Sequence, residues 1–293
     1  MTPQAQTMVF DPSTPPDVQA WLKSQTAAGC SCDSMFNALC ESGWMPYQSA
    51  RMMALTDDER QVLGVAQVES SGYANAQVPR PQLILRDVQV DGGDKLVRVL
   101  QQRTAPDLIE FEALLSDAEC DALMQVAQPR LSRSLTVDLQ TGGHEIHPDR
   151  SSQGMFFDRA ETPLIATIEA RIAKLLGWPT THGENLQILR YPPGAQYLPN
   201  YDYFDPAQTG TTELLKRGGQ RVATLVMYLH EPTSAGATVF PDIDLAIAPK
   251  RGNAVFFSYA APDPATLSLH GGDPVTAGVK WIATKWLRQS VFE

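Results

Sequence analysis

Apolar residues recur every three or four positions in the first part of the chain and alternate with polar residues in the last part. Helical spacing begins at the start signal Pro15-Pro16-Asp17 and continues through residue 22. Residues 35–40 repeat this spacing, and residues 51–63 form a third segment. The pattern predicts a small helical region that ends near Gly64, preceded by about 14 residues of disordered composition.

The middle of the chain combines strand and helix signals. Asp91-Gly-Gly-Asp94 predicts a turn between strands at 83–90 and 96–101, and a further strand is predicted at 109–115. Ser116-Asp-Ala-Glu119 has the form of a capping box and predicts a helix through about residue 127. Ile165, Ile168, Ile172 and Leu175 share one face of a second helix, predicted over residues 160–176.

Beyond Gly183 the pattern changes to short strands separated by Gly and Pro turns. Strands are predicted at 186–191, 221–229, 237–240, 245–248, 253–259 and 279–287. Strands of this length and spacing predict a sandwich or barrel. We therefore expect a helical extension over residues 1–80 and a mainly β domain over residues 81–293.

Composition narrows the class of protein. With 43% hydrophobic and 19% charged residues, the 293-residue chain has the balance of a soluble globular protein. A formal charge of −10 disfavours nonspecific binding to nucleic acid or to an anionic membrane. The first residues lack a basic segment followed by an apolar run, and no stretch is apolar enough to span a bilayer. We expect a cytoplasmic protein whose four cysteines are free thiols.

The most informative residues lie in the last hundred positions. Asn200 and Asp202 are two residues apart, so on a strand their side chains share a face. His270 follows much later, next to the glycine pair at 271–272. Two donors from one strand and a third from a later one can occupy one face of an octahedral metal, as in non-haem Fe(II) oxygenases.

A lysine ten residues after His270 adds to this pattern. On the predicted strand, Lys280 shares a face with residues 282, 284, 286 and 288, which include Trp286 and Arg288. Cations that face a sandwich interior need an anion, because a buried charge is costly without one. A dicarboxylic acid would meet that need.

Further short stretches carry a family resemblance. They are Leu115–Cys120, Arg150-Ser-Ser, Glu184–Tyr191, Gln220–Leu229, Thr238–Pro241, Pro249–Gly252, Ser268–His270 and Lys280–Trp286. In this order they resemble the prolyl 4-hydroxylase branch of the Fe(II)/2-oxoglutarate dioxygenases, over about residues 109–288. The region before about residue 80 is not part of the resemblance.

The resemblance implies an α+β, mainly β fold: a double-stranded β-helix (jelly roll) with supporting helices. It implies that O2 and 2-oxoglutarate are co-substrates at an Fe(II) centre, with ascorbate as a candidate accessory reductant. It assigns Asp202 and His270 to the metal, and Lys280, Tyr191 and Thr238 to 2-oxoglutarate, with Trp286 near the same site. It places Tyr197, Arg221 and Arg288 toward a prolyl or other amino-acid-derived substrate.

One position departs from the family pattern. The family has His-x-Asp where this chain has Asn200-Tyr-Asp202, so Asn200 is the candidate third metal ligand. An amide oxygen is a weaker donor to Fe(II) than an imidazole. Three explanations stay open: a mutated enzyme, a natural variant with altered chemistry, or a pseudoenzyme. Ala237 also replaces a glutamate that is common in the family.

The same residues leave a second function open. A catalytically silent jelly roll could bind a proline-rich peptide through Tyr197, Trp286 and Arg288, and the metal need not be iron. His144 and His147 could act as ligands, but a mobile loop over the site is the preferred interpretation. Residues 1–80 could form a homodimer, recruit a substrate or support the β domain.

Overall fold

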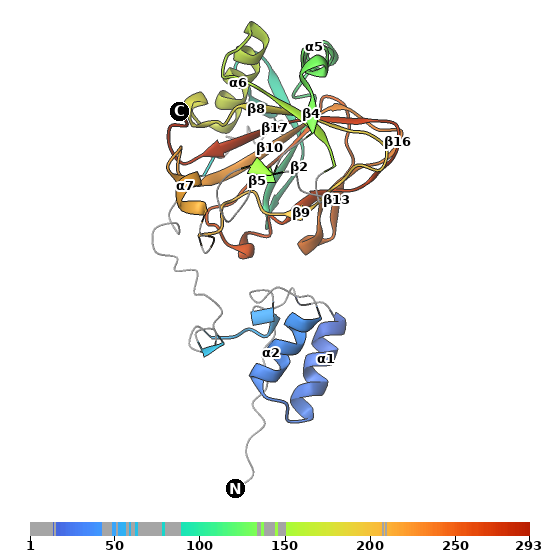
Figure 1. Cartoon of the computed structure of the whole chain (residues 1–293), viewed down its shortest axis with the longest axis vertical. Coiled ribbons are helices and arrows are strands. Elements are labelled where there is room, and N and C mark those ends of the chain that lie inside the picture. Colours follow the sequence, from blue (N-terminus) through green and yellow to red (C-terminus); the bar gives the residue numbers. More distant parts are fainter. Residues whose placement is uncertain are drawn as a thin grey trace. The chain divides into compact units, whose positions relative to one another are not determined.

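The computed structural model shows two compact units, residues 1–69 and 70–293, coloured from blue to red along the chain in Figure 1. The sequence pattern puts this boundary after residue 80. The described residues are 14, 16–42, 49–50, 52–56, 59, 62–63, 78–79, 89–133, 136–137, 144–145, 151–206, 208 and 210–293. Residues 83–88 of the predicted strand at 83–90, the Arg150 motif residue and His147 lie outside them.

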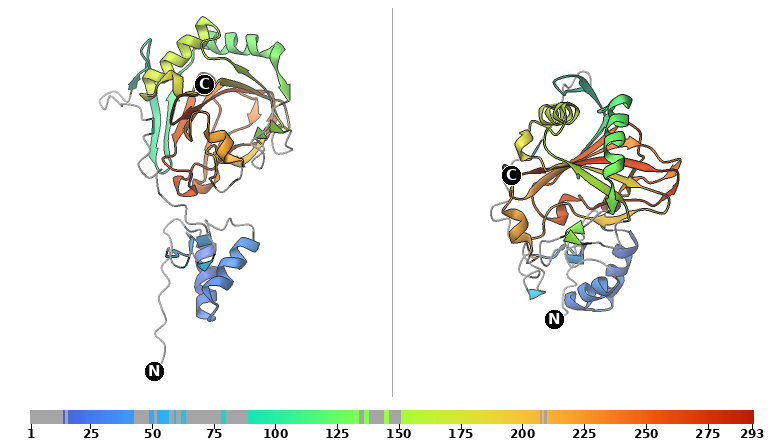
Figure 2. Two further views of the ribbon diagram at one scale, coloured as in Figure 1. Left: turned by 60° about the vertical axis from the view of Figure 1, so that its left-hand side comes forward. Right: turned by 45° about the horizontal axis from the view of Figure 1, so that its top comes forward.

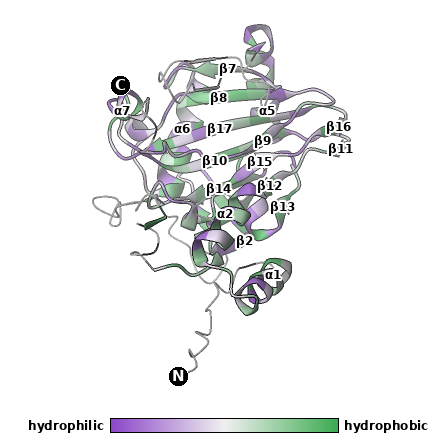
Figure 3. Ribbon diagram, turned by 60° about the horizontal axis from the view of Figure 1, so that its bottom comes forward, coloured by the Kyte–Doolittle hydropathy of each residue, from purple (hydrophilic) through white to green (hydrophobic). Residues whose placement is uncertain are grey.

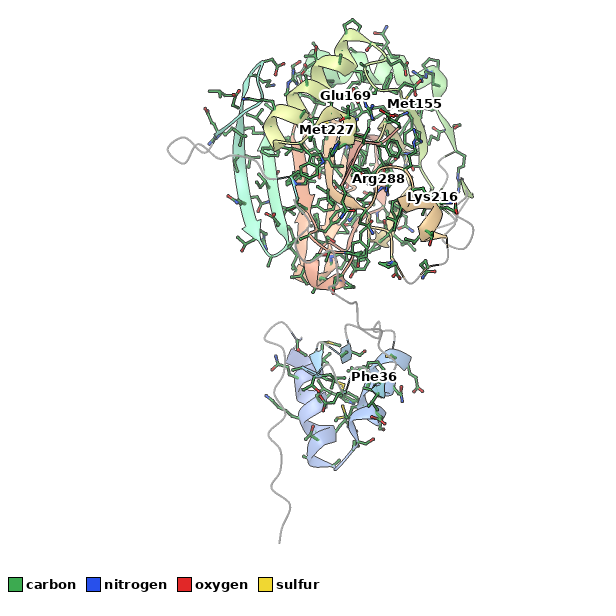
Figure 4. The ribbon with its side chains drawn as sticks, turned by 90° about the vertical axis from the view of Figure 1, so that its left-hand side faces the viewer. Phe36, Met155, Glu169, Lys216, Met227 and Arg288 are labelled. Carbon is green, nitrogen blue, oxygen red and sulfur yellow. The ribbon has the colours of Figure 1, made fainter. Side chains whose placement is uncertain are left out.

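Helices form the N-terminal unit, as the apolar spacing predicts. They are α1 (Pro16–Ala27) and α2 (Cys32–Glu41). Ser31 caps α2, because its Oγ accepts a hydrogen bond of 3.2 Å from the backbone N–H of Ser34. Phe36, labelled in Figure 4, lies in a small apolar core with Leu22, Leu39 and Met53.

The third predicted helix, over residues 51–63, is wrong as a single element. Residues 53–56 form a turn and a short irregular segment, and Ala54 has a positive φ of 48°. Thr56 and Glu59 then make reciprocal hydrogen bonds, with Thr56 N donating to the Glu59 carboxylate over 2.8 Å and Glu59 N donating to Thr56 Oγ1 over 3.3 Å. This capping box marks a new helical start that the apolar spacing did not reveal.

Antiparallel strands in the described part of the second unit form a nine-stranded sheet, here called the large sheet (Figure 3). Its order is β1 (Gln89–Asp91), β2 (Leu96–Thr104), β3 (Asp107–Glu112), β14 (Ala254–Ser258), β10 (Arg221–His230), β17 (Lys280–Arg288), β8 (Leu186–Tyr191), β7 (Gln153–Phe157) and β4 (Ser132–Arg133). The predicted strands at 186–191, 221–229, 253–259 and 279–287 correspond to β8, β10, β14 and β17.

A second sheet, here called the small sheet, has the order β13 (Leu245–Ile247), β12 (Thr238–Phe240), β15 (His270–Gly272) and β9 (Tyr197–Asn200). Two further pairs join β11 (Ser234–Ala235) to β16 (Val275–Ala277) and β5 (Thr136–Val137) to β6 (His144–Glu145). The short helices are α7 (Thr211–Leu215), η1 (Gln128–Arg130), η2 (Thr180–His182), η3 (Pro241–Ile243) and η4 (Pro264–Thr266).

The large sheet is buried on both faces by different partners. Its outer face packs with α5 (Asp117–Ala127) and α6 (Pro163–Leu176), which lie along one side of the strands in Figure 2. Its inner face shares a second core, centred on Tyr228 and Phe257, with Phe240 and Ile247 of the small sheet. The mainly β jelly-roll fold with supporting helices is confirmed, and the predicted N-terminal helices are present.

The two covering helices begin at identifiable caps. Ser116 and Glu119 form the predicted capping box of α5. The second helix begins at Pro163 rather than at residue 160, because Thr162 caps it and Ala160 has a positive φ of 54°. Within the described part of the chain, none of the helices is both long and apolar enough to cross a bilayer.

A buried ion pair joins the large sheet to α6. Lys285 Nζ lies 2.6 Å from Glu169 Oε1, and the side chains are only 2% and 3% exposed. Glu169, labelled in Figure 4, also accepts a hydrogen bond of 2.9 Å from the backbone N–H of Ala160. Burial lowers the pKa of Lys285, and the Glu169 carboxylate opposes that shift.

We predict that Lys285→Met lowers the free energy of unfolding by about 3–5 kcal/mol, because the Glu169 carboxylate is left buried without its cation. The double variant Lys285→Met with Glu169→Leu should recover most of this loss. Urea denaturation of the three proteins measures both effects. A Lys285→Met protein as stable as the parent would show that the pair does not join the sheet to the helix energetically.

Candidate active site

A cavity lies between the inner face of the large sheet and the small sheet. Strands β8, β10 and β17 supply one wall, and β9, β12 and β15 supply the other. The residues that line it are Leu189, Tyr191, Tyr197, Asp202, Thr224, Val226, Thr238, His270, Gly271, Gly272, Lys280, Ile282, Thr284 and Trp286. Four alternate residues of β17 therefore face it, as strand parity predicted.

Asp202 and His270 meet in this cavity. The distance between His270 Nε2 and Asp202 Oδ2 is 3.4 Å, and both residues are buried. The His270 Nδ1 atom lies 3.0 Å from the carbonyl oxygen of Ser268. A carbonyl can only accept, so in the neutral ring Nδ1 carries the proton and Nε2 is left to act as a ligand. This is the tautomer that an Nε2 metal ligand requires.

Side chains behind these two donors hold them in place. Thr224 Oγ1 donates a hydrogen bond of 2.6 Å to Asp202 Oδ2 and lies 2.9 Å from the hydroxyl of Tyr259. Since the single Thr224 proton goes to the carboxylate, Tyr259 must donate to Thr224. The His270 ring packs against the Phe257 ring, with centroids 4.6 Å apart. The donors are thus fixed by buried neighbours.

Asn200 lies beside the donors, opposite His270 in the β9–β15 pair. Its Nδ2 atom donates a hydrogen bond of 3.0 Å to the carbonyl of Leu198. Its distance to the carbonyl of His270 is 3.5 Å. The amide is therefore turned toward backbone carbonyls, and Asn200 is not among the residues that line the cavity.

A register shift in β9 accounts for the arrangement of its side chains. His270 pairs with Asn200, but Gly272 pairs with Tyr197, so β9 contains one more residue than β15 over this stretch. The bulge puts Tyr197, which lines the cavity, out of phase with the end of the strand, and Asp202 reaches the cavity from the bend that follows β9. The predicted common face of Asn200 and Asp202 is therefore wrong, since only Asp202 lines the cavity. Gly271 permits the close pairing, since a Cβ atom there would lie 2.9 Å from the carbonyl oxygen of Tyr197.

Lys280 forms the opposite end of the cavity. It is 3% exposed, and its Nζ lies 5.7 Å from the ring centroid of Tyr191 and 5.8 Å from that of Tyr228. Among the described residues its ammonium forms no ion pair, although Asp273 acts on it at longer range. Burial lowers the pKa of Lys280 from 10.5 to about 8. A carboxylate ligand would supply the missing counter-charge.

Two hydroxyl groups lie near this lysine. Tyr228 donates a hydrogen bond of 2.8 Å to Thr238 Oγ1, and burial raises the pKa of Tyr228 well above its usual range. Thr238 lines the cavity. Because Tyr228 stays neutral, its hydroxyl acts as a donor. Its one proton goes to Thr238, so the Lys280 cation and the Thr238 hydroxyl, which Tyr228 orients, form a polar end suited to one carboxylate group.

Arg221 lies next to the cavity without lining it. Glu184 binds its guanidinium through hydrogen bonds of 2.6 and 2.9 Å. The same carboxylate lies 3.1 Å from Arg288 Nε. The Arg221 guanidinium also stacks on Trp286, 4.1 Å from the ring centroid. Arg221 is thus already paired with Glu184. It affects the cavity only through the Trp286 indole, against which its guanidinium packs.

Most of the site residues predicted from the sequence share this cavity. Tyr191, Tyr197, Asp202, Thr238, His270, Lys280 and Trp286 line it, whereas Asn200 and Arg221 lie beside it. The sequence pattern did not reveal Thr224, Tyr228 and Glu184. The first two share the inner face of β10 by alternation, so parity on that strand could have found them. Nothing in the sequence pattern singled out Glu184.

Comparison with known proteins agrees with the family resemblance seen in the sequence. A family model described as the 2OG-Fe(II) oxygenase superfamily matches residues 186–288, which contain Asp202, His270 and Lys280. Prolyl 4-hydroxylase 2 of Arabidopsis thaliana is 35% identical over 221 residues, covering 67% of this chain and 72% of that protein. Prolyl 4-hydroxylase 1 of the same plant is 39% identical over 230 residues, covering 70% and 80%.

Among solved structures, the 2OG complex of the viral collagen prolyl hydroxylase vCPH from Paramecium Bursaria Chlorella virus-1 has a TM-score of 0.47. It is 30% identical in sequence and covers 62% of this chain and 95% of that chain.

We predict that Thr224→Val lowers the affinity of the site for a divalent metal by about 10- to 100-fold, because Asp202 loses the hydrogen bond that orients it. Thr224→Ser keeps the hydroxyl and should bind as the parent does. Anaerobic calorimetry with Fe(II) or Mn(II) measures the affinities. Equal affinity in the Val and Ser variants would contradict a role for this hydroxyl.

Proposed function

This chain belongs to the 2OG-Fe(II) oxygenase superfamily, in its prolyl 4-hydroxylase-like branch, and on that premise we propose that it hydroxylates a prolyl or other amino-acid-derived C–H bond. The observation that carries the proposal is the content of one cavity. Asp202 and His270 Nε2 face each other across 3.4 Å, and the buried Lys280 ammonium lines the same cavity without a paired anion among the described residues.

The residues present fit the cofactors that the family uses. Asp202 and His270 would hold Fe(II), and Lys280 with the Thr238 hydroxyl, which Tyr228 orients, would hold a carboxylate of 2-oxoglutarate. When bound, the iron and 2-oxoglutarate supply oxidative decarboxylation of the co-substrate, coupled to oxidation of a C–H bond by O2. The chain itself fixes both donors, orients the His270 ring through the hydrogen bond of Nδ1 with the Ser268 carbonyl and presents a largely apolar wall that excludes water.

The metal triad of this chain is altered. Asn200 replaces the expected histidine, and its amide hydrogen-bonds to the carbonyl of Leu198. Two strong donors and one weak or absent donor should bind Fe(II) less tightly than three. We infer that this form turns over slowly and couples decarboxylation poorly to substrate oxidation.

The substrate proposal rests on what the relatives are known to be and on which side chains line the cavity. The plant relatives above are named prolyl 4-hydroxylases. In this chain, Tyr197 and Trp286 line the cavity from opposite sheets. The buried indole Nε1 of Trp286 has no hydrogen-bond partner among the described residues, so it suits an acceptor such as a substrate carbonyl. A peptide or amino-acid-derived substrate fits these features.

The position of the Asn200 amide also favours a second candidate function. A chain that binds metal weakly could use the same cavity to recognise a proline-rich peptide without turnover, through Tyr197 and Trp286. Arg288, the third residue that the sequence pattern assigned to this role, does not line the cavity. Succinate release on adding iron, ascorbate and 2-oxoglutarate separates the two functions. No release, with peptide binding intact, would favour the binding module.

We predict that Asn200→His raises Fe(II) affinity by one to two orders of magnitude, because imidazole is the stronger donor to this metal. Succinate formation should rise with it. Anaerobic metal titration and a succinate assay, run on the parent and the variant, measure both quantities.

The variant Asn200→Ala is the control for the amide itself. If Asn200 Oδ1 turns to bind the metal, this variant should lose affinity, whereas an amide that stays on the Leu198 carbonyl leaves it unchanged. Equal iron affinity and equal succinate formation in the Asn200→His protein and the parent would show that position 200 is not a ligand position.

We predict that the affinity for 2-oxoglutarate is constant below pH 8 and falls above it. Lys280 has a pKa of about 8, so at higher pH the free protein carries a neutral amine, and binding a carboxylate must first restore the proton. The dissociation constant should rise by up to about tenfold per pH unit. By the same linkage, stability of the ligand-free fold should increase between pH 8 and 10.5.

Calorimetric titration of 2-oxoglutarate from pH 7 to 9.5 checks this. Lys280→Met should bind weakly at every pH with no such step. A parent protein whose affinity does not change across this range would contradict the assignment of Lys280 to the carboxylate.

A further inference from the structure

The metal-binding carboxylate of Asp202 is carried by a segment that has no strand partner of its own among the described residues. Strand β9 ends at Asn200, and residues 201–205 are bends or irregular backbone. Phe204 is nevertheless only 5% exposed. A buried peptide group needs hydrogen-bond partners, so something other than a sheet must supply them here.

Gln220 supplies them. Its side chain is 2% exposed. Its Nε2 donates a hydrogen bond of 2.7 Å to the carbonyl of Phe204, and its Oε1 accepts one of 2.8 Å from the N–H of Phe204. The carboxamide thus bonds to both backbone groups of one residue, as a neighbouring strand would. The same Oε1 also accepts from the N–H of Arg221 over 3.0 Å.

The Phe204 ring is held as firmly as its backbone. The guanidiniums of Arg221 and Arg288 each lie 4.8 Å from the ring centroid. Glu184 pairs with both arginines, which keeps two cations close together at this point. Arg221 Nη1 also donates to the carbonyl of Asp202 over 3.3 Å. Figure 4 labels Arg288 among the side chains of this unit.

From these contacts we propose that Gln220 is a positioning residue for the metal site: its carboxamide fixes the backbone of Phe204 and thereby the direction of the Asp202 carboxylate. Gln220 directly precedes β10, and Arg221 is the first residue of that strand. Thr224 on the same strand donates a hydrogen bond to the carboxylate itself. One strand therefore sets both ends of the segment 202–204 relative to His270. The inference rests on the proposed function only in taking Asp202 as a metal ligand.

The test compares three variants by anaerobic calorimetry with Mn(II). Gln220→Met keeps the length of the side chain and removes its hydrogen bonds, so affinity should fall about tenfold. Gln220→Glu keeps the acceptor and loses the donor, so it should lie between Met and the parent. Gln289→Met is the matched control. Gln289 Oε1 accepts from the N–H of Gln220 over 3.0 Å but, among the described residues, forms no hydrogen bond with residues 202–204, so its loss should leave metal affinity unchanged.

A purely structural role makes a different prediction. In that case Gln220→Met and Gln289→Met would both lower the melting temperature, and the metal affinity of each folded variant would equal that of the parent. Unchanged affinity in Gln220→Met, or an equal loss in Gln289→Met, would overturn the proposal.

A second measurement uses the unmodified protein and can overturn the proposal even if the variants do not fold. Hydrogen exchange should show the N–H of Phe204 protected to nearly the same degree as amides in β10. Exchange of that amide within seconds would overturn the proposal. If the parent binds no metal but its Phe204 amide is protected, the proposed function fails, whereas the hydrogen bonding of Gln220 to the Phe204 backbone is supported.

Discussion

The large sheet must bury both of its faces. The outer face packs against two helices, and the inner face packs against the small sheet and lines the cavity. On β17, residues 281, 283 and 287 face the helices and join the outer core, while residues 280, 282, 284 and 286 face the cavity. On β10 the same alternation places Thr224, Val226 and Tyr228 inside. Strand alternation thus separates an outer hydrophobic layer, which packs against the helices, from an inner layer that combines a second apolar core with the polar residues of the cavity.

This separation explains why a lysine can lie on each face of one strand. Lys285 points outward and pairs with Glu169 inside the helix layer. Lys280 points inward and has no paired anion among the described residues. The first charge is neutralised within the protein, so its role is structural. The second awaits an anion from outside, and that difference marks it as part of a binding site.

Local patterns predicted many of the strands, and the family resemblance predicted most of the residues of the cavity. Alternation gave β8, β10, β14 and β17 with small boundary errors, and motif order placed Asp202, His270 and Lys280 in one site. Strand pairing could not be read in this way, because the neighbours β10 and β17 are far apart in sequence. The direction of the Asn200 amide and the pairing of Arg221 with Glu184 also depend on tertiary contacts. The short strands β9 and β15 gave too few residues for a periodic signal.

The extra residue in β9 has a consequence for how such a site can diversify. Because Leu198 and Pro199 occupy the bulge, the chain upstream and downstream of it is out of phase by one position. Removing a single residue there would rotate Tyr197 out of the cavity and leave Asp202 in place. Length variation at this one edge is therefore a means of exchanging one wall of the cavity while Asp202 and His270 stay fixed.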